Sequence, residues 1–220
     1  MKARRKKKAI RLAFALVVLA AAWAVMLRYG FGPVDRMILE AVYIGDQPYL
    51  KFLALQLGHF GAPSAVMLLV VGAAVYLLMN HDYWRAPIPL VATLLAHAAC
   101  LGQQMLVGRP RPHDLVGLPP LSAPSFLPTR VVDPLVAYLL VALLLTNGGR
   151  KSRLLVAGAV LVGGSNGIVR VILGHHWPSD AVAGWAFGAA VALTAYYLSK
   201  LLPRNRAASD VLYRRAQTGE

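Results

Sequence analysis

The sequence is poor in cysteine, in acidic residues and in charge of any kind. Cys100 is the only cysteine among 220 residues, so no intrachain disulfide can form and no cluster of thiolates can hold a metal. Charged residues make up 15% of the chain and hydrophobic residues 58%, and the mean hydropathy is +0.56. A soluble domain of this length needs more surface charge. We therefore exclude an ordinary soluble fold, and we expect neither a metal nor a cofactor.

Apolar residues occur in long blocks instead. Crossing a hydrocarbon core of ~30 Å takes roughly 20 helical residues. None of the blocks shows the alternation of a membrane barrel strand, which favours helices. The sequence thus predicts an all-α, polytopic membrane protein with a six-helix transmembrane bundle, its spans at about 9–28, 63–80, 87–107, 131–147, 154–174 and 181–202.

Basic residues outnumber acidic ones, 23 to 9, which gives a net charge of +14. With six spans, 16 of the 23 fall on one side of the membrane and 7 on the other. The positive-inside rule then places both termini in the cytoplasm. We attribute the charge to topology and to contact with anionic membrane lipids, and not to nucleic acid.

The chain is predicted to form one transmembrane domain, 9–202, between a basic cytoplasmic N-terminus, 1–8, and a basic cytoplasmic tail, 203–220. We expect a multi-pass protein of a bacterial inner membrane. Its first apolar block follows a basic start, as in a signal peptide, but is expected to be retained as an anchor. The sequence leaves the oligomeric state open.

Three segments connect the spans on the outer side, so a site built from them opens to the exterior. Residues 29–63 carry apolar side chains at roughly helical spacing, which favours helices lying at the membrane interface. Residues 108–130 hold six of the 14 prolines and cannot be helical throughout. Residues 174–179 are few and lead directly into the last helix.

In and beside these segments, four arginines accompany three carboxylates. An arginine near the bilayer centre costs roughly 2.5–3.5 kcal/mol on insertion scales, so it usually has an anionic partner. The excess of cations leaves room for an external anion, and the planar guanidinium suits phosphate. The arginines are Arg109, Arg111, Arg130 and Arg170, and the carboxylates are Asp114, Asp133 and Asp180.

The third outer segment belongs to the stretch R-V-I-L-G-H-H-W-P-S-D, residues 170–180. Pro178 suits the first turn of the last helix, which places Asp180 within hydrogen-bonding reach of His176. A histidine whose one nitrogen is held in this way can direct the other at phosphorus as a nucleophile. The helix N-terminus adds amide donors for an anion. This loop therefore predicts phosphate chemistry.

These residues resemble the signature of the type 2 phosphatidic acid phosphatases (PAP2), a superfamily that includes bacterial undecaprenyl-pyrophosphate phosphatases and vanadium haloperoxidases. Its third motif, S-R-x5-H-x3-D, is matched by Arg170, His176 and Asp180, with Val169 in place of the serine. The resemblance implies that His176 is the nucleophile and that Asp180 orients it.

The other two motifs, K-x6-R-P and P-S-G-H, are incomplete. Arg111 and its following proline match the first, but Gln104 stands where lysine is expected. Residues 127–130, Leu-Pro-Thr-Arg, stand where P-S-G-H is expected, so the motif's histidine is absent. The resemblance implies that Arg111 and Arg170 bind phosphate oxygens, and we add Gln104, Arg109 and Arg130 as further phosphate-binding candidates.

The absent histidine would have protonated the leaving group, which typically contributes ~10²–10⁴-fold to the rate. A pyrophosphate leaves more readily than an alkoxide, so lipid pyrophosphates such as polyprenyl pyrophosphate are favoured over phosphatidate. His113 and His175 are candidate replacement acids. The sequence leaves open a weakened or specialised lipid phosphatase or phosphotransferase, a non-catalytic lipid-phosphate binder or membrane-complex partner, and, least favoured, a haloperoxidase-like oxidant.

Overall fold

The structure is a computed structural model that describes residues 2–30, 32–112, 123–146 and 148–202. All regular secondary structure in these residues is helical, which confirms the all-α prediction. The helices are α1 (Lys2–Tyr29), α2 (Pro33–Val42), α3 (Pro48–His59), α4 (Pro63–Met79), α5 (Ile88–Val107), α7 (Thr129–Leu145), α8 (Gly149–Ile172) and α9 (Pro178–Ser199).

Five segments of the described chain are long and apolar enough to cross a membrane: Ala9–Tyr29, Pro48–Met79, Ile88–Val107, Gly149–Ile172 and Pro178–Ser199. The predicted span at 131–147 corresponds to α7, which has only 17 residues. It lies inside the bundle, in contact with α4, α5, α8 and α9, and most of its residues are buried. The chain is therefore a multi-pass membrane protein whose central helix, α7, is one of its shorter bundle helices.

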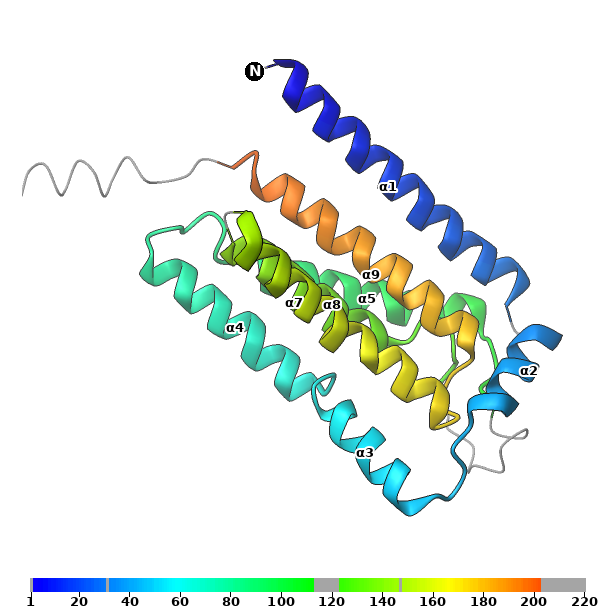
Figure 1. Cartoon of the computed structure of the whole chain (residues 1–220). Coiled ribbons are helices and arrows are strands. Elements are labelled where there is room, and N and C mark those ends of the chain that lie inside the picture. The colour runs from blue at the N-terminus through cyan, green and yellow to red at the C-terminus, as the bar shows by residue number, and fades with distance from the viewer. Residues whose placement is uncertain (1, 31, 113–122, 147, 203–220) are drawn as a thin grey trace, which may run out of the picture.

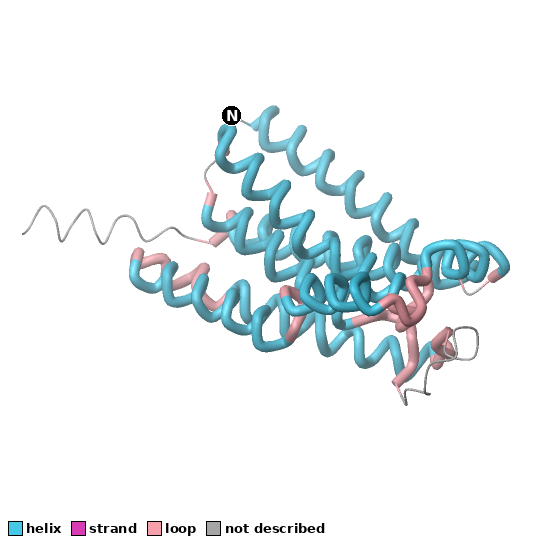
Figure 2. The backbone as a smooth tube through the Cα atoms, turned by 60° about the horizontal axis from the view of Figure 1, so that its bottom comes forward, coloured by secondary structure: helices cyan, strands magenta, loops and turns pink. Residues whose placement is uncertain are grey.

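The bundle helices run side by side, and α2 and α3 lie at one end of them (Figure 1). The first residues of α1 and the last residues of α9 lie at the opposite end (Figure 1). Figure 2 shows the loops mostly at the ends of the bundle. The described parts of the segments expected to build the site, 108–112, 123–130 and 174–179, share this end with α2 and α3.

Close packing between α7 and α9 positions the helix that carries Asp180. A Cβ at Gly184 would lie 2.9 Å from Val131 Cγ1, and one at Gly188 would lie 3.3 Å from the carbonyl oxygen of Val132. Larger residues at these two positions would push the helices apart. The glycines therefore let α9 approach α7 within the fold.

The first outer segment forms α2 and α3, as the helical spacing predicted. The amide of Ile44, between these helices, donates to the carbonyl of Ile172 at the end of α8 (3.1 Å). Ala54 of α3 is buried against Val169 and Leu173. This packing places the C-terminal end of α3 beside the end of α8, where the site lies.

Candidate active site

The third outer segment is a tight turn between α8 and α9. Gly174 has a φ of +71°, a left-handed conformation that suits glycine. The amides of His175 and His176 both donate to the carbonyl of Arg170, at 2.9 and 3.3 Å. Trp177 then precedes the first turn of α9, and its indole donates to the carbonyl of Pro110 (2.8 Å). The turn is thereby fixed to the second outer segment.

The His176 ring lies between Arg111 and Ser125. Its Nε2 is 3.1 Å from Arg111 Nη1, and its Nδ1 is 3.0 Å from the carbonyl oxygen of Ser125. A guanidinium can only donate and a carbonyl can only accept, so the partners assign the proton to Nδ1 and the lone pair to Nε2. The unprotonated Nε2 is the nitrogen that could attack phosphorus.

Asp180 does not bind His176 directly. Its Oδ2 is 3.9 Å from His176 Nδ1, so the hydrogen bond expected from the sequence is not formed. The hydroxyl of Ser125 lies between them, donating to Asp180 Oδ2 and sitting 3.2 Å from His176 Nδ1. Ser125 is completely buried, and sequence reasoning did not identify this role because Ser125 lies just before the degenerate second motif.

The surroundings of His176 favour its neutral form. Burial is the main cause that lowers its pKa well below the usual value for histidine, and the positive charges of Arg111 and Arg170 lower it further. A hydrogen bond to the backbone of Ser125 acts in the opposite direction but is outweighed. At neutral pH the imidazole is therefore unprotonated at Nε2, as nucleophilic attack requires.

Arg109, predicted from the sequence to bind phosphate, donates here to protein groups. Its Nη1 is 2.7 Å from Asp180 Oδ1 and 3.2 Å from Ser179 Oγ. Its Nη2 donates to the carbonyls of Met26 and Leu27 at the end of α1, at 3.0 and 3.1 Å. Only 6% of Arg109 is exposed. It thus balances the buried charge of Asp180 and joins α1 to α9.

Asp35 of α2 takes part in the same network, although sequence reasoning did not single it out as a site residue. Its carboxylate accepts from the Ser179 amide (2.9 Å) and from the Ser179 hydroxyl. Asp35 is buried, and an anion at the N-terminus of a helix is stabilised by the helix dipole. The signal in the sequence was a lone aspartate near the start of an amphipathic helix.

The other three arginines lie around the exposed side of the site. Arg111 also donates to the carbonyls of Ala123 (2.7 Å) and His175 (3.0 Å). Arg170 Nη1 is 3.2 Å from His175 Nδ1, while Arg170 Nε is buried with no hydrogen-bond partner in the described structure. Arg130 is exposed and, with Arg111, is close enough to Arg170 to repel its charge.

Arg130 and Arg170 line a cavity of about 150 Å³ at the ends of α3, α7 and α8. Water occupies about 30 Å³ per molecule in the liquid, so a space of this size can hold a phosphate group. A buried donor without a partner is costly, and Arg170, which lines this cavity, has such a donor at Nε. The cavity therefore has the charge and the room for an anion.

The start of the degenerate second motif is folded into the core. Phe126 and Leu127 are completely buried, and Gln104 Nε2 donates to the carbonyl of Leu127 (2.7 Å). Gln104, which was predicted to bind phosphate, thus holds the backbone of this segment. Of the two candidate acids, His175 faces Arg170 and His113 lies outside the described residues.

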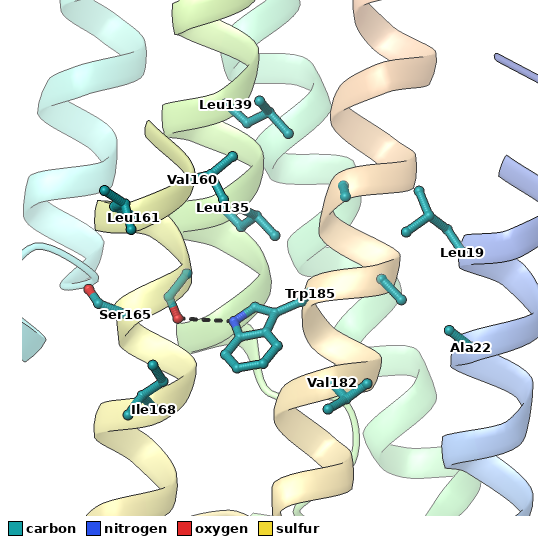
Figure 3. A pocket seen from close by; sticks show the side chains of 13 residues that line it. Leu19, Ala22, Leu135, Leu139, Val160, Leu161, Ser165, Ile168, Val182 and Trp185 are labelled. Atoms are coloured by element: carbon teal, nitrogen blue, oxygen red, sulfur yellow. Dashed lines mark hydrogen bonds between the residues drawn. The ribbon is translucent and has the colours of Figure 1, made fainter. Parts of the chain in front are cut away.

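An apolar groove of about 620 Å³ runs beside the site along α8 and α9 (Figure 3). Trp185 crosses it and donates to the carbonyl of Gly164 (3.0 Å). Leu19 and Ala22 of α1 line its opposite side (Figure 3). Its residues on α9 extend from Val182 to Ala189, so the groove begins two residues beyond Asp180 and leads away from the site.

A family model described as the PAP2 superfamily matches residues 85–204, which are 120 of the 220 residues. No curated protein matches the chain. Among solved structures, the crystal structure of the first transmembrane PAP2 type phosphatidylglycerolphosphate phosphatase from Bacillus subtilis is similar, with a TM-score of 0.78 and 20% sequence identity. The match covers 88% of this chain and 100% of that one. At this identity the likeness shows a shared transmembrane fold.

Proposed function

This chain belongs to the PAP2 superfamily, and we propose that it removes phosphate from a lipid phosphate or lipid pyrophosphate through a phosphohistidine intermediate. The observation that carries this proposal is the orientation of His176. Its Nε2 carries the lone pair beside Arg111, and its Nδ1 is held by Ser125. A buried histidine with only a structural role would not need a guanidinium beside its unprotonated nitrogen.

In the proposed reaction, Nε2 of His176 attacks phosphorus and the bond to the leaving oxygen breaks. Arg111 and Arg170 neutralise charge on the phosphoryl oxygens, and Arg130 supports the leaving group from the cavity. Water then attacks the phosphohistidine, which releases inorganic phosphate and restores His176. Asp180 and Ser125 hold the ring, and Arg109 holds Asp180.

Lipid pyrophosphates, such as a polyprenyl pyrophosphate, are the substrate class that we favour. A phosphate leaving group needs less protonation than an alkoxide, and no histidine stands in the second motif. The tail of the lipid would lie in the apolar groove beside α9. From Asp180 to Ala189 the helix rises about 14 Å, a length over which acyl or prenyl carbons can pack in the groove.

The proposed orientation places the site at the outer leaflet of a bacterial inner membrane, with both termini in the cytoplasm. The excess of basic residues on the side of the termini supports it. A second candidate function is that of an inactive family member that binds a lipid phosphate or a membrane partner. The second motif favours this alternative, because Leu127 at its start is buried and no histidine follows in it.

The test is phosphate release by the purified full-length protein from a polyprenyl pyrophosphate and from phosphatidate, compared with His176→Ala. We expect release that depends on His176 and is faster with the pyrophosphate. Equal release by wild type and variant would rule out the enzyme. Vanadate, a phosphate analogue, should bind the wild type and lose affinity in His176→Ala and Arg170→Ala.

A further inference from the structure

The cavity beside Arg170 contains a histidine that no motif contributes. His59, the last residue of α3, lines it together with Arg130 and Arg170. The other lining residues are apolar or small: Leu55, Gly58, Ala62, Val169 and Leu173. An imidazole thus lines the same space as Arg170, which is proposed to bind the phosphoryl group, and Arg130, which is proposed to support the leaving group.

The position of His59 is fixed by the packing of α3 on α8. A Cβ at Gly58 would lie 3.6 Å from Val169 Cγ1, so the two helices are in van der Waals contact immediately before His59. After His59, the carbonyl of Phe60 accepts from the hydroxyl of Tyr138 on α7 (3.2 Å). The end of α3 is therefore held against both helices that carry the cavity arginines.

The charge around His59 is positive. The charged groups that face it are Arg130 from α7 and Arg170 from α8, while α3 itself contributes only Leu55 and Gly58 to the lining. Both guanidiniums can bind an anionic phosphate, and an imidazole is a side chain that can donate a proton near neutral pH.

We propose that His59 is the general acid of this protein and supplies the proton that the second motif no longer provides. This inference rests on the proposed phosphatase function. As His176 Nε2 attacks phosphorus, the bond to the leaving oxygen breaks and the His59 imidazolium donates its proton to that oxygen. Solvent then returns a proton to His59, and water attacks the phosphohistidine and loses a proton to solvent, which yields inorganic phosphate and restores both histidines.

The test compares His59→Gln with wild type on two substrates that differ in the leaving group. Phosphatidate expels an alkoxide and needs protonation, whereas p-nitrophenyl phosphate expels a stable anion and does not. We expect kcat for phosphatidate to fall by ~10²–10⁴-fold, the usual contribution of general acid catalysis. With p-nitrophenyl phosphate the change should stay below about threefold, since proton transfer is no longer required.

His81→Gln is the matched control. His81 is an exposed histidine in the connection between α4 and α5, at the other end of α4 from His59, and its ring contacts Tyr83. It should leave both rates unchanged. Circular dichroism and the melting temperature in detergent should be the same for all three proteins, because His59 is exposed at a helix end.

The outcomes separate this inference from the proposed function. Equal losses on both substrates would make His59 a binding or structural residue and overturn the inference, as would unchanged phosphatidate turnover in His59→Gln. Wild-type turnover confined to activated substrates would likewise contradict an internal acid. In each of these cases, release that depends on His176 would leave the proposed function intact. Release from no substrate would overturn both.

Discussion

His176 and Asp180 lie four residues apart at the start of α9, yet Nδ1 of the histidine is 3.9 Å from Oδ2 of the carboxylate. The hydroxyl of Ser125 occupies the gap and contacts both side chains. Ser125 comes from the second outer segment, so the orientation of the nucleophile depends on that segment although its motif is degenerate. Ser125, Phe126 and Leu127 are completely buried, which explains how this segment can position the ring without supplying a histidine.

Replacing Ser125 with alanine should test this bridge. The backbone carbonyl would still accept from His176 Nδ1 and preserve the tautomer, but the hydrogen bond to Asp180 would be lost. We expect a lower kcat with little change in KM, and a loss of about 1.5–3 kcal/mol in unfolding free energy because a charged acceptor is involved. Ser152→Ala is the control, since its hydroxyl contacts only Thr146 away from the site. Equal kcat in Ser125→Ala and wild type would argue against the bridge.

The buried pair of Arg109 and Asp180 predicts strong coupling between two substitutions. Arg109→Met leaves the Asp180 carboxylate buried and uncompensated, which typically costs about 3–5 kcal/mol. The double variant Arg109→Met, Asp180→Leu removes both charges and should recover part of that loss. Thermal unfolding of wild type, Arg109→Met, Asp180→Leu and the double variant in one detergent measures the coupling. Additive losses in the double variant would show that the two charges do not stabilise each other.

Much of the fold was readable from the sequence because the bilayer imposes simple rules. Apolar blocks of about 20 residues must be helices, and prolines mark several helix starts, as at Pro63 and Pro178. The boundaries of α7 were predicted two residues too late, since apolar composition does not mark where a helix begins. Its central position could not be predicted, because burial depends on contacts with four other helices.

The site was only partly predictable for a related reason. Arg170, His176 and Asp180 lie within 11 residues, so local spacing is enough to bring them together. Ser125, Asp35 and His59 reach the site from distant segments that contain no recognisable motif. The contact of Arg109 with Asp180 spans 71 residues, and nothing in the sequence distinguished this arginine from the arginines beside the cavity.

The lowered pKa of His176 predicts the pH dependence of the reaction. The attacking imidazole must be neutral, so activity is lost as the pH falls through its pKa. Because burial, Arg111 and Arg170 lower that pKa, the acid limb of kcat/KM should lie below the usual value for histidine, about 6.5. Arg111→Gln removes one repelling charge, raises the pKa and should move the limb to higher pH. Arg111→Lys retains the positive charge and should keep the pKa of His176, and with it the acid limb, low. An acid limb at the same pH in both variants would contradict this account.

The apolar groove beside α9 predicts that a larger side chain at Gly164 weakens binding of the lipid tail. This glycine lines the groove, and a Cβ added to it meets nothing within 4 Å, so Gly164→Leu can fold while filling the space. We expect a higher KM for a long-tailed lipid phosphate and no change for p-nitrophenyl phosphate. Gly158→Leu on the same helix is matched in helix propensity and also has open space, but it lies outside the groove. Equal KM values for the lipid in both variants would place its tail elsewhere.

The last prediction concerns where the proton for the leaving group comes from. Arg130 stands where the family's second motif has its histidine, and it lines the same cavity as His59. An arginine keeps its proton at neutral pH and cannot act as an acid, whereas a histidine in its place could. The substitution Arg130→His, made in the slow His59→Gln variant, should therefore raise the turnover of phosphatidate. We expect an increase of at least about tenfold, because general acid catalysis typically contributes ~10²–10⁴-fold. Arg130→Gln in the same background is the control, because it removes the same charge without adding an acid. Rescue by both substitutions would show that the charge of Arg130 was inhibitory, while rescue by histidine alone would show that the cavity accepts an acid from either α3 or α7.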